Sequence, residues 1–372
     1  MEDLLQQIKP ILLMGPGPSC VCDDAYKALQ NPPRGHLDPV FITIMDGIKE
    51  HLKAVFHTTN EMTLTISGTG SAGMETCFVN LVEPGDKVLV MLNGVFGARQ
   101  KEVAERLGAI VDTLEIPFGH AILPEEVEEK LADGPYKIVS IVHAETSAGV
   151  LNPIDEIAPI VKETGALLLV DCVTSLGCIP VKVDEWQADA VYSCSQKGLS
   201  CPPGLSPVTF SPQAMEMIKA RKTKVPNWYL DLTLLEKYWS GSPRAYHHTA
   251  PSNLYYALYA GLRALLIEGE EHAFARQLAA HNQLVEGLGE LGLRLTVDED
   301  DCLPVVNVVG IPEGINDAEV RSRLLNEFQI EIGSGLGELA GKVWRIGLMG
   351  QTSKPENVTR LLDALTTILK TA

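Results

Sequence analysis

Short apolar runs alternate along the first half of the chain with stretches in which apolar residues recur at helical spacing. Apolar runs typical of buried strands cover Met62–Ser67, Lys87–Leu92, Ile110–Glu115, Lys137–Val142, Ala166–Asp171 and Ala190–Cys194. The helical spacing predicts helices between them, over Ala72–Leu81, Gly97–Leu107, Pro124–Ala132 and Ile154–Thr164. Strands that alternate with helices in this way predict βαβ units around a mostly parallel sheet.

The pattern changes near Asn253, where the strand-like runs give way to a long helical stretch that we expect to cover Asn253–Leu291. Two strand-like pieces follow, Leu293–Val297 and Val305–Val309, with helices near Asp317–Glu327 and Lys354–Leu369. We therefore expect an N-terminal arm of residues 1–20, a large α/β/α domain over residues 21–265, and a smaller α/β domain over residues 266–372.

The composition excludes several classes of protein. Of the 372 residues, 45% are hydrophobic and 21% are charged, which is typical of a globular chain. The net charge is −18 and no run of Lys or Arg occurs, which argues against binding nucleic acid. Apolar stretches such as Ala166–Val170 are far shorter than the ~18 residues of a membrane span. The first residues include Glu2 and Asp3 and do not resemble a secretory signal, so we expect a cytoplasmic protein without a membrane partner.

The cysteines and histidines do not form a metal-binding or disulfide pattern. The eight cysteines include no CxxC pair, and several lie within apolar runs. Buried free thiols in a reducing compartment fit this pattern better than a disulfide framework. The nine histidines include no HExxH motif, and only His247 and His248 are adjacent. We expect no metal site.

A glycine-rich motif follows the first predicted strand. Gly68, Gly70 and Gly73 form the pattern GxGxxG and open a predicted helix, as in dinucleotide-binding folds. Those folds also need an acidic residue at the end of the next strand, whereas Lys87–Leu92 ends in Asn93 and Gly94. An NAD-binding dehydrogenase is therefore a weaker alternative. A glycine-rich turn at a helix N-terminus can still hold a phosphate.

Two further strand ends carry candidate chemistry. Asp171 ends one apolar strand, and Lys197 lies 26 residues later, just after another. The carboxyl ends of parallel strands are where such folds place ligands. A carboxylate can pair with a protonated ring nitrogen, and a lysine can form a Schiff base with an aldehyde. Together with a phosphate-binding turn, these residues supply what pyridoxal 5'-phosphate requires.

Eight segments, in order along the chain, give a specific resemblance. They are Met14–Ser19, Ser67–Glu75, Asn93–Arg99, His143–Val150, Leu168–Gly177, Ser193–Gly204, Tyr246–Pro251 and Lys342–Gly350. With these segments the chain resembles the class V pyridoxal-phosphate-dependent aminotransferases, in particular the alanine–glyoxylate and serine–pyruvate (serine–glyoxylate) group. The resemblance implies fold type I of the pyridoxal-phosphate-dependent transferases and a homodimer with shared active sites.

The resemblance also implies a role for individual residues. Lys197 would form the Schiff base and move a proton at the substrate, and Asp171 would pair with the ring nitrogen. Phe96 would stack on the ring, where related enzymes often have Trp, and Thr146 would bind the phenolic oxygen. The phosphate-binding and substrate-binding residues would be Thr69, Gly70, Ser71 and Gln196 from one subunit, Tyr246 and Thr249 from the other, and Arg345 and Gly17 at the substrate. Some relatives have His at the position of Ser71, but a Ser hydroxyl can also donate a hydrogen bond.

The sequence favours one reaction among those of the family. A cysteine desulfurase needs a nucleophilic cysteine in a C-terminal loop, and the glycine-rich stretch Gly333–Gly341 contains none. A phosphoserine aminotransferase needs additional cations for a second phosphate. We therefore expect transfer of an amino group from alanine or serine to glyoxylate, giving glycine and a 2-oxo acid. A ureidoglycine–glyoxylate aminotransferase is the alternative.

Overall fold

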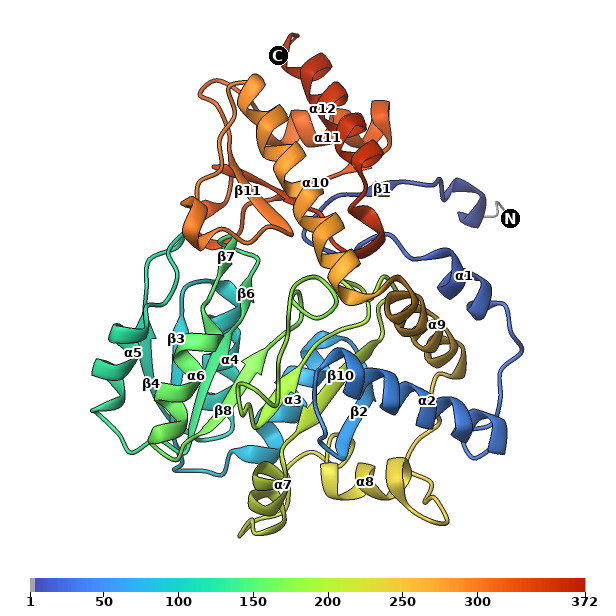
Figure 1. Cartoon of the computed structure of the whole chain (residues 1–372), viewed down its shortest axis with the longest axis vertical. Coiled ribbons are helices and arrows are strands. Elements are labelled where there is room, and N and C mark those ends of the chain that lie inside the picture. The colour runs from blue at the N-terminus through green and yellow to red at the C-terminus, as the bar shows by residue number, and fades with distance from the viewer. Residues whose placement is uncertain (1–3, 372) are drawn as a thin grey trace.

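A seven-stranded sheet lies at the centre of the larger body in Figure 1, a computed structural model that describes residues 4–371. In spatial order its strands are β2 (Met62–Ser67), β10 (Leu205–Phe210), β9 (Ala190–Tyr192), β8 (Leu167–Asp171), β5 (Ile138–Val142), β3 (Lys87–Leu92) and β4 (Ile110–Glu115). The pairs from β9 to β4 are parallel, and β10 alone runs antiparallel to both neighbours. The predicted mostly parallel sheet is therefore confirmed.

Helices between successive strands pack around this sheet. They include α3 (Gly70–Leu81), α4 (Val95–Arg106), α5 (Pro124–Leu131) and α6 (Ile154–Glu163). Further elements of the larger body are α1 (Asp23–Leu29), α2 (Pro39–Val55), β6 (Ala144–Glu145), β7 (Val150–Leu151), α7 (Pro212–Lys219) and α8 (Leu232–Ser240). Because parallel strands end at the same edge of a sheet, the residues that follow β3, β5, β8 and β9 lie close together.

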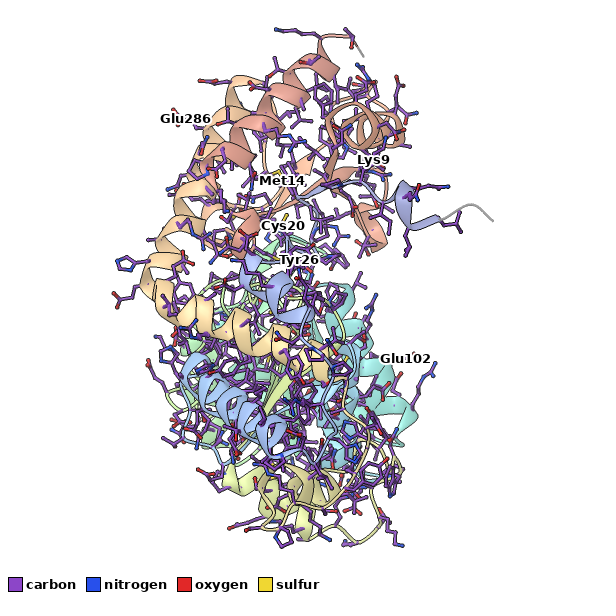
Figure 2. All side chains as sticks on the ribbon, turned by 90° about the vertical axis from the view of Figure 1, so that its right-hand side faces the viewer. Lys9, Met14, Cys20, Tyr26, Glu102 and Glu286 are labelled. Carbon is purple, nitrogen blue, oxygen red and sulfur yellow. The ribbon has the colours of Figure 1, made fainter. Side chains whose placement is uncertain are left out.

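The second body has its own sheet and its own hydrophobic core. Its strands are β11 (Val306–Gly310), β14 (Val343–Gly347) and β13 (Gly333–Ser334), and its helices are α10 (Glu270–Glu290), α11 (Asp317–Phe328) and α12 (Pro355–Leu369). The N-terminal strand β1 (Leu12–Leu13) pairs in parallel with β12 (Ile330–Glu331). Leu12 and Met14 accordingly pack into the C-terminal core. In Figure 2, Met14 lies in the upper body and Cys20 below it, so this segment connects the two bodies.

Two of the predicted elements near the C-terminal body were wrong in detail. The stretch Asn253–Leu291 forms two helices, α9 (Ser252–Glu268) and α10, rather than one. Gly269 breaks them apart with a φ of 84°, which glycine adopts at little cost. The predicted strand Leu293–Val297 is reduced to a single bridge between Leu295 and Val309. None of the helices within residues 4–371 is long and apolar enough to cross a bilayer.

Candidate active site

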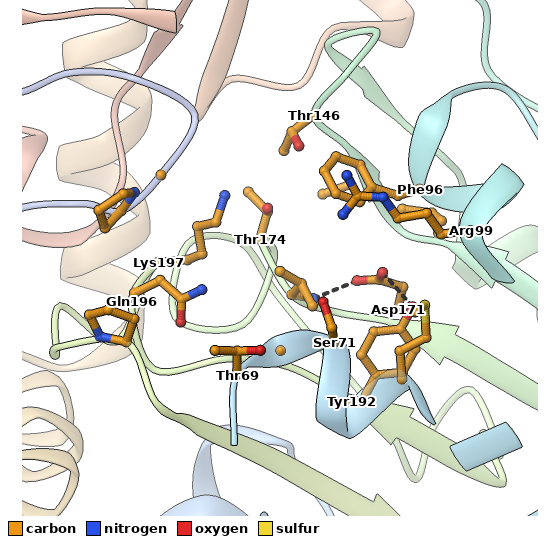
Figure 3. Close-up of a pocket in the computed structure, with 18 residues that line it drawn as sticks. Thr69, Ser71, Phe96, Arg99, Thr146, Asp171, Thr174, Tyr192, Gln196 and Lys197 are labelled. Carbon is orange, nitrogen blue, oxygen red and sulfur yellow. Dashed lines mark hydrogen bonds between the residues drawn. The ribbon is translucent and has the colours of Figure 1, made fainter. Parts of the chain in front are cut away.

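A cleft of about 280 Å³ opens at the carboxyl edge of the central sheet. Its walls come from the ends of β5, β8 and β9, the N-terminal turns of α3 and α4, and the segment that follows β1. Figure 3 shows the side chains that point into it. The cleft brings together these residues singled out from the sequence: Gly17, Thr69, Gly70, Ser71, Phe96, Thr146, Asp171, Gln196 and Lys197.

Asp171 lies buried at the floor of the cleft, at the end of β8. Its Oδ2 accepts a hydrogen bond of 2.6 Å from the Tyr192 hydroxyl, and its Oδ1 accepts one of 2.7 Å from the Val173 N–H. Burial raises the pKa of Asp171 to about 7, although both hydrogen bonds act in the opposite direction. A cationic group beside this carboxyl would favour its ionised form, so the site suits a protonated ring nitrogen.

Lys197 reaches into the cleft from the loop that follows β9. Its Nζ donates a hydrogen bond to the Pro16 carbonyl, and Ser19 Oγ donates to the Lys197 carbonyl at 2.7 Å. A Cβ on Gly17 would lie 2.3 Å from Nζ, and Gly17 has a φ of 123°, so a larger residue here would displace the lysine and strain the backbone. Burial lowers the pKa of the Lys197 amine, and the charge of Arg345 acts in the same direction. A lysine with a lowered pKa has more of the neutral, nucleophilic amine at physiological pH.

The N-terminus of α3 forms another wall of the cleft. Thr69 precedes the helix and its side chain makes no capping hydrogen bond. The first N–H groups of a helix have no partner within the helix and carry a partial positive charge. A Cβ on Gly70 would lie 3.1 Å from the Cys194 Cβ, so the turn packs closely against the loop before Lys197. Gln196 Oε1 is buried there and has no hydrogen-bond partner within residues 4–371. This wall is suited to an anionic group.

Arg345 comes from β14 of the second body and lies beside the cleft. Its Nε donates to the Ser334 carbonyl at 2.7 Å, and one terminal nitrogen, Nη1, donates to the Thr146 carbonyl at 3.2 Å. The side chain is buried, which lowers the pKa of Arg345 to about 10, while the carboxylate of Glu145 acts in the opposite direction. The guanidinium is thus fixed between the two bodies and keeps its charge at neutral pH.

The sequence analysis missed several residues of the cleft. Tyr192 donates to Asp171 and lies opposite it in the paired strands β8 and β9. The sequence predicted the strand that contains Tyr192 but not its register against the strand that ends at Asp171. Arg99 lies one helical turn after Phe96, and its Cζ is 5.0 Å from the centre of the Phe96 ring. Thr174 lines the same cleft from the loop after Asp171. Arg99 and Thr174 lie within two of the segments that carry the family resemblance, but the sequence assigned no role to either.

Two predicted residues lie elsewhere on this chain. Tyr246 and Thr249 are both exposed, Tyr246 to 59%, and neither belongs to the cleft. The Tyr246 ring contacts His36, with ring centres 4.5 Å apart. The surface next to it also exposes Trp228, to 63%, with its indole stacked on His247. The structure therefore places Tyr246 and Thr249 on an aromatic surface and not at their own chain's cleft.

The sequence model of the family Aminotransferase class-V matches residues 23–360 of the chain. The chain therefore belongs to this family of transaminases. It is 40% identical to the alanine–glyoxylate aminotransferase of Rattus norvegicus over 357 residues, covering 95% of this chain and 86% of the relative. The crystal structure of alanine–glyoxylate aminotransferase from Nostoc sp. has a TM-score of 0.95 and 46% identity, covering 99% of this chain and 100% of that chain. The ureidoglycine–glyoxylate aminotransferase of Bacillus subtilis has a TM-score of 0.96 and 39% identity, covering 98% of this chain and 94% of that chain.

Proposed function

We propose that this aminotransferase uses pyridoxal 5'-phosphate to transfer an amino group from alanine or serine to glyoxylate. The arrangement that carries the proposal is a lysine, a buried aspartate and an open helix N-terminus facing one cleft. The lysine suits the aldehyde of the cofactor, the aspartate suits its ring nitrogen, and the helix N-terminus suits its phosphate. The named substrates of the rat and Nostoc relatives support the choice of alanine and glyoxylate.

The residues present fit the cofactor. Gln196 Oε1 is a buried acceptor without a partner among the described residues, and it lies at the end of the cleft where we place the phosphate. With the amide turned by 180°, its N–H groups would be directed at the phosphate, whose oxygens accept hydrogen bonds, and its oxygen would point away from it. Asp171 and Tyr192 form an acceptor for the ring nitrogen at the other end. The bound cofactor supplies an aldehyde for the amino group and a ring that takes up electron density from the substrate.

Each residue of the cleft then has a defined task. Lys197 would hold the cofactor through its ε-amine, and the same amine would move a proton to or from the substrate Cα. Asp171 would keep the ring nitrogen protonated, which a buried carboxylate does through direct charge pairing. Phe96 would stack on the ring, and Thr146 would donate a hydrogen bond to the phenolic oxygen. Ser71 and Thr69 would bind the phosphate together with the helix N-terminus.

Arg345 is the group that we propose for the substrate carboxylate. Alanine, serine, glyoxylate and pyruvate all carry one carboxylate next to the reacting carbon. A buried guanidinium presents two N–H groups in a plane, which matches the two oxygens of a carboxylate. Nη2 of Arg345 has no hydrogen-bond partner within residues 4–371 and is available for this contact. Gly17, which lines the cleft next to Lys197, is the second residue that we propose at the substrate.

The enzyme is proposed to work as a homodimer. Tyr246 and Trp228 are both largely exposed, and Thr249 is exposed three residues after Tyr246. Large apolar groups that are exposed together on one surface are typical of contact sites between proteins. In the dimer, Tyr246 and Thr249 reach the phosphate in the partner's cleft. Replacing Thr249 with Ala should then weaken cofactor binding without a change at the chain's own cleft.

A titration of the absorbance of the purified enzyme tests the choice of substrates. We expect L-alanine or L-serine to convert the bound cofactor to its amine form, and glyoxylate to restore the original spectrum. The donor that acts at the lower concentration is the preferred one. If neither donor changes the spectrum but (S)-ureidoglycine does, the function of the Bacillus subtilis relative applies instead. If no amine changes it, the proposed transfer is wrong.

A further inference from the structure

Glu145 is a fully buried carboxylate beside the cleft that the reaction described above does not use. It lies at the end of β6, directly before Thr146. Its Oε2 accepts hydrogen bonds from the backbone N–H groups of Phe96 at 3.0 Å and Gly97 at 3.4 Å. Its Oε1 accepts from the N–H of Ser147 at 3.0 Å and from the Ser147 hydroxyl at 2.6 Å. Each of these partners can donate, so both oxygens act as acceptors.

These contacts fix the N-terminus of α4 against the loop that carries Thr146. Ser147 Oγ also accepts a hydrogen bond of 2.9 Å from the Val95 N–H, so Glu145 and Ser147 together satisfy the first three N–H groups of the helix. A Cβ on Gly94 would lie 2.3 Å from Glu145 Cδ, so the close approach depends on glycine. A carboxylate at a helix N-terminus is further stabilised by the helix dipole.

The same carboxylate links two groups that face the cofactor from different elements. Phe96 belongs to the first turn of α4, and its own N–H donates to Glu145. Thr146 follows Glu145 in the chain, and its carbonyl accepts from Arg345. In Figure 3, Phe96 and Thr146 both lie at the upper side of the cleft, above Asp171. No contact between the Phe96 and Thr146 side chains is needed to hold this spacing, because Glu145 bridges their backbones.

We propose that Glu145 is a positioning residue that sets Phe96 and Thr146 at the spacing that the pyridoxal ring requires. The inference rests on the proposed cofactor. Stacking on one face of the ring and a hydrogen bond at its edge are satisfied together only if α4 and the loop after β6 keep a fixed separation. A charged acceptor is suited to this task because it holds several N–H donors at once, whereas a neutral amide offers a single acceptor oxygen.

The variant Glu145→Gln tests the proposal, because it keeps the size of the side chain. The NH2 group of the glutamine donates and cannot accept a hydrogen bond. It must face either the N–H groups of α4 or the donors of Ser147, so the hydrogen bonds on one of these two sides are lost. We expect the dissociation constant of pyridoxal 5'-phosphate, measured by quenching of tryptophan fluorescence, to rise about ten- to a hundredfold. We also expect a smaller circular dichroism signal from the bound cofactor, because its ring is held less firmly. The milder variant Ser147→Ala should weaken binding about two- to tenfold and covers the case in which Glu145→Gln does not fold.

The matched control is Asp189→Asn. Asp189 directly precedes β9 and so lies at the amino ends of the parallel strands, away from the cleft at their carboxyl ends. Asp189 is also a buried carboxylate, which accepts from the Leu168 N–H at 2.9 Å and pairs with Lys162 at 2.5 Å. Its replacement should lower the melting temperature and leave cofactor affinity and dichroism unchanged. If Glu145→Gln and Ser147→Ala behave like this control, Glu145 is purely structural and the proposal is wrong. If the unaltered enzyme binds no pyridoxal 5'-phosphate, the proposed function itself fails, which is a different result.

Discussion

The variant Tyr192→Phe tests the electrostatic design of the cleft, because it removes one of the two hydrogen bonds to Asp171. It also removes the hydrogen bond of 3.0 Å that the buried Gln100 Nε2 donates to the Tyr192 hydroxyl, which should lower stability without changing the charge near Asp171. The bond to Asp171 is 2.6 Å long, and the Val173 N–H bond to the other carboxyl oxygen remains. A hydrogen bond to a charged group contributes about 1.5 to 3 kcal/mol, which corresponds to about 1 to 2 pH units in the titration of its acceptor. The hydrogen bond favours the ionised carboxylate, so its loss should raise the pKa of Asp171 above the value of about 7 in the unaltered chain.

The consequence appears in cofactor binding. A protonated ring nitrogen pairs with the ionised form of Asp171, so affinity should rise with pH and level off above the pKa of this carboxyl. The dissociation constant of pyridoxal 5'-phosphate is measured between about pH 5.5 and about pH 9 by fluorescence quenching. We expect the midpoint of Tyr192→Phe to lie about 1 to 2 pH units higher.

A second tyrosine supplies the control. Tyr136 donates a hydrogen bond of 2.8 Å to Asp112 on the edge strand β4, far from the cleft along the sheet. Replacing Tyr136 with Phe removes the same kind of bond and should leave the pH profile of cofactor binding unchanged. An identical midpoint in the Tyr192→Phe variant and the unaltered chain would refute the assignment of Asp171 as the partner of the ring nitrogen.

Three further replacements probe the remaining groups of the cleft. Lys197→Ala should abolish transamination and leave the far-ultraviolet circular dichroism of the fold unchanged; turnover near that of the unaltered enzyme contradicts the role of this lysine. Arg345→Ala should raise the KM for both the amino acid and the 2-oxo acid about a hundredfold, with little change in cofactor affinity, because two charged hydrogen bonds to the substrate are lost. Gly17→Ala should reduce turnover strongly, since the new Cβ would lie 2.3 Å from Lys197 Nζ and the backbone has a φ of 123°; unchanged kcat would show that the lysine does not need this space.

The alternation of apolar runs and helical patterns predicted most of the central sheet, because each buried parallel strand is apolar along its whole length. It did not predict β10, the antiparallel strand between β2 and β9. Pro207 lies in the middle of this strand and lacks the N–H that an inner strand normally donates, so the run does not resemble a strand. The break at Gly269 was also missed, although a glycine followed by Glu270 and Glu271 is typical of the end of one helix and the acidic first turn of the next.

The site shows a similar division between local and long-range information. Asp171 and Lys197 were found because each follows an apolar strand, and the order of the strands brings them to one edge. Glu145 had no such signal, since its partners Phe96 and Gly97 are 49 and 48 residues away in the chain. Its importance depends on the packing of α4 against the loop after β6, which sequence periodicity does not encode. Arg99 lies one helical turn after Phe96, so the helical spacing allows their contact, but it does not show that this turn of the helix lines the cleft.

Chemical trapping of the cofactor tests the central claim most directly. The purified enzyme is loaded with pyridoxal 5'-phosphate, reduced with borohydride and digested, and the modified peptide is identified by mass spectrometry. The account predicts a phosphopyridoxyl group on Lys197, and its absence when the enzyme is first treated with an excess of the amino donor. Modification of a different lysine, or of none, would contradict the proposed site.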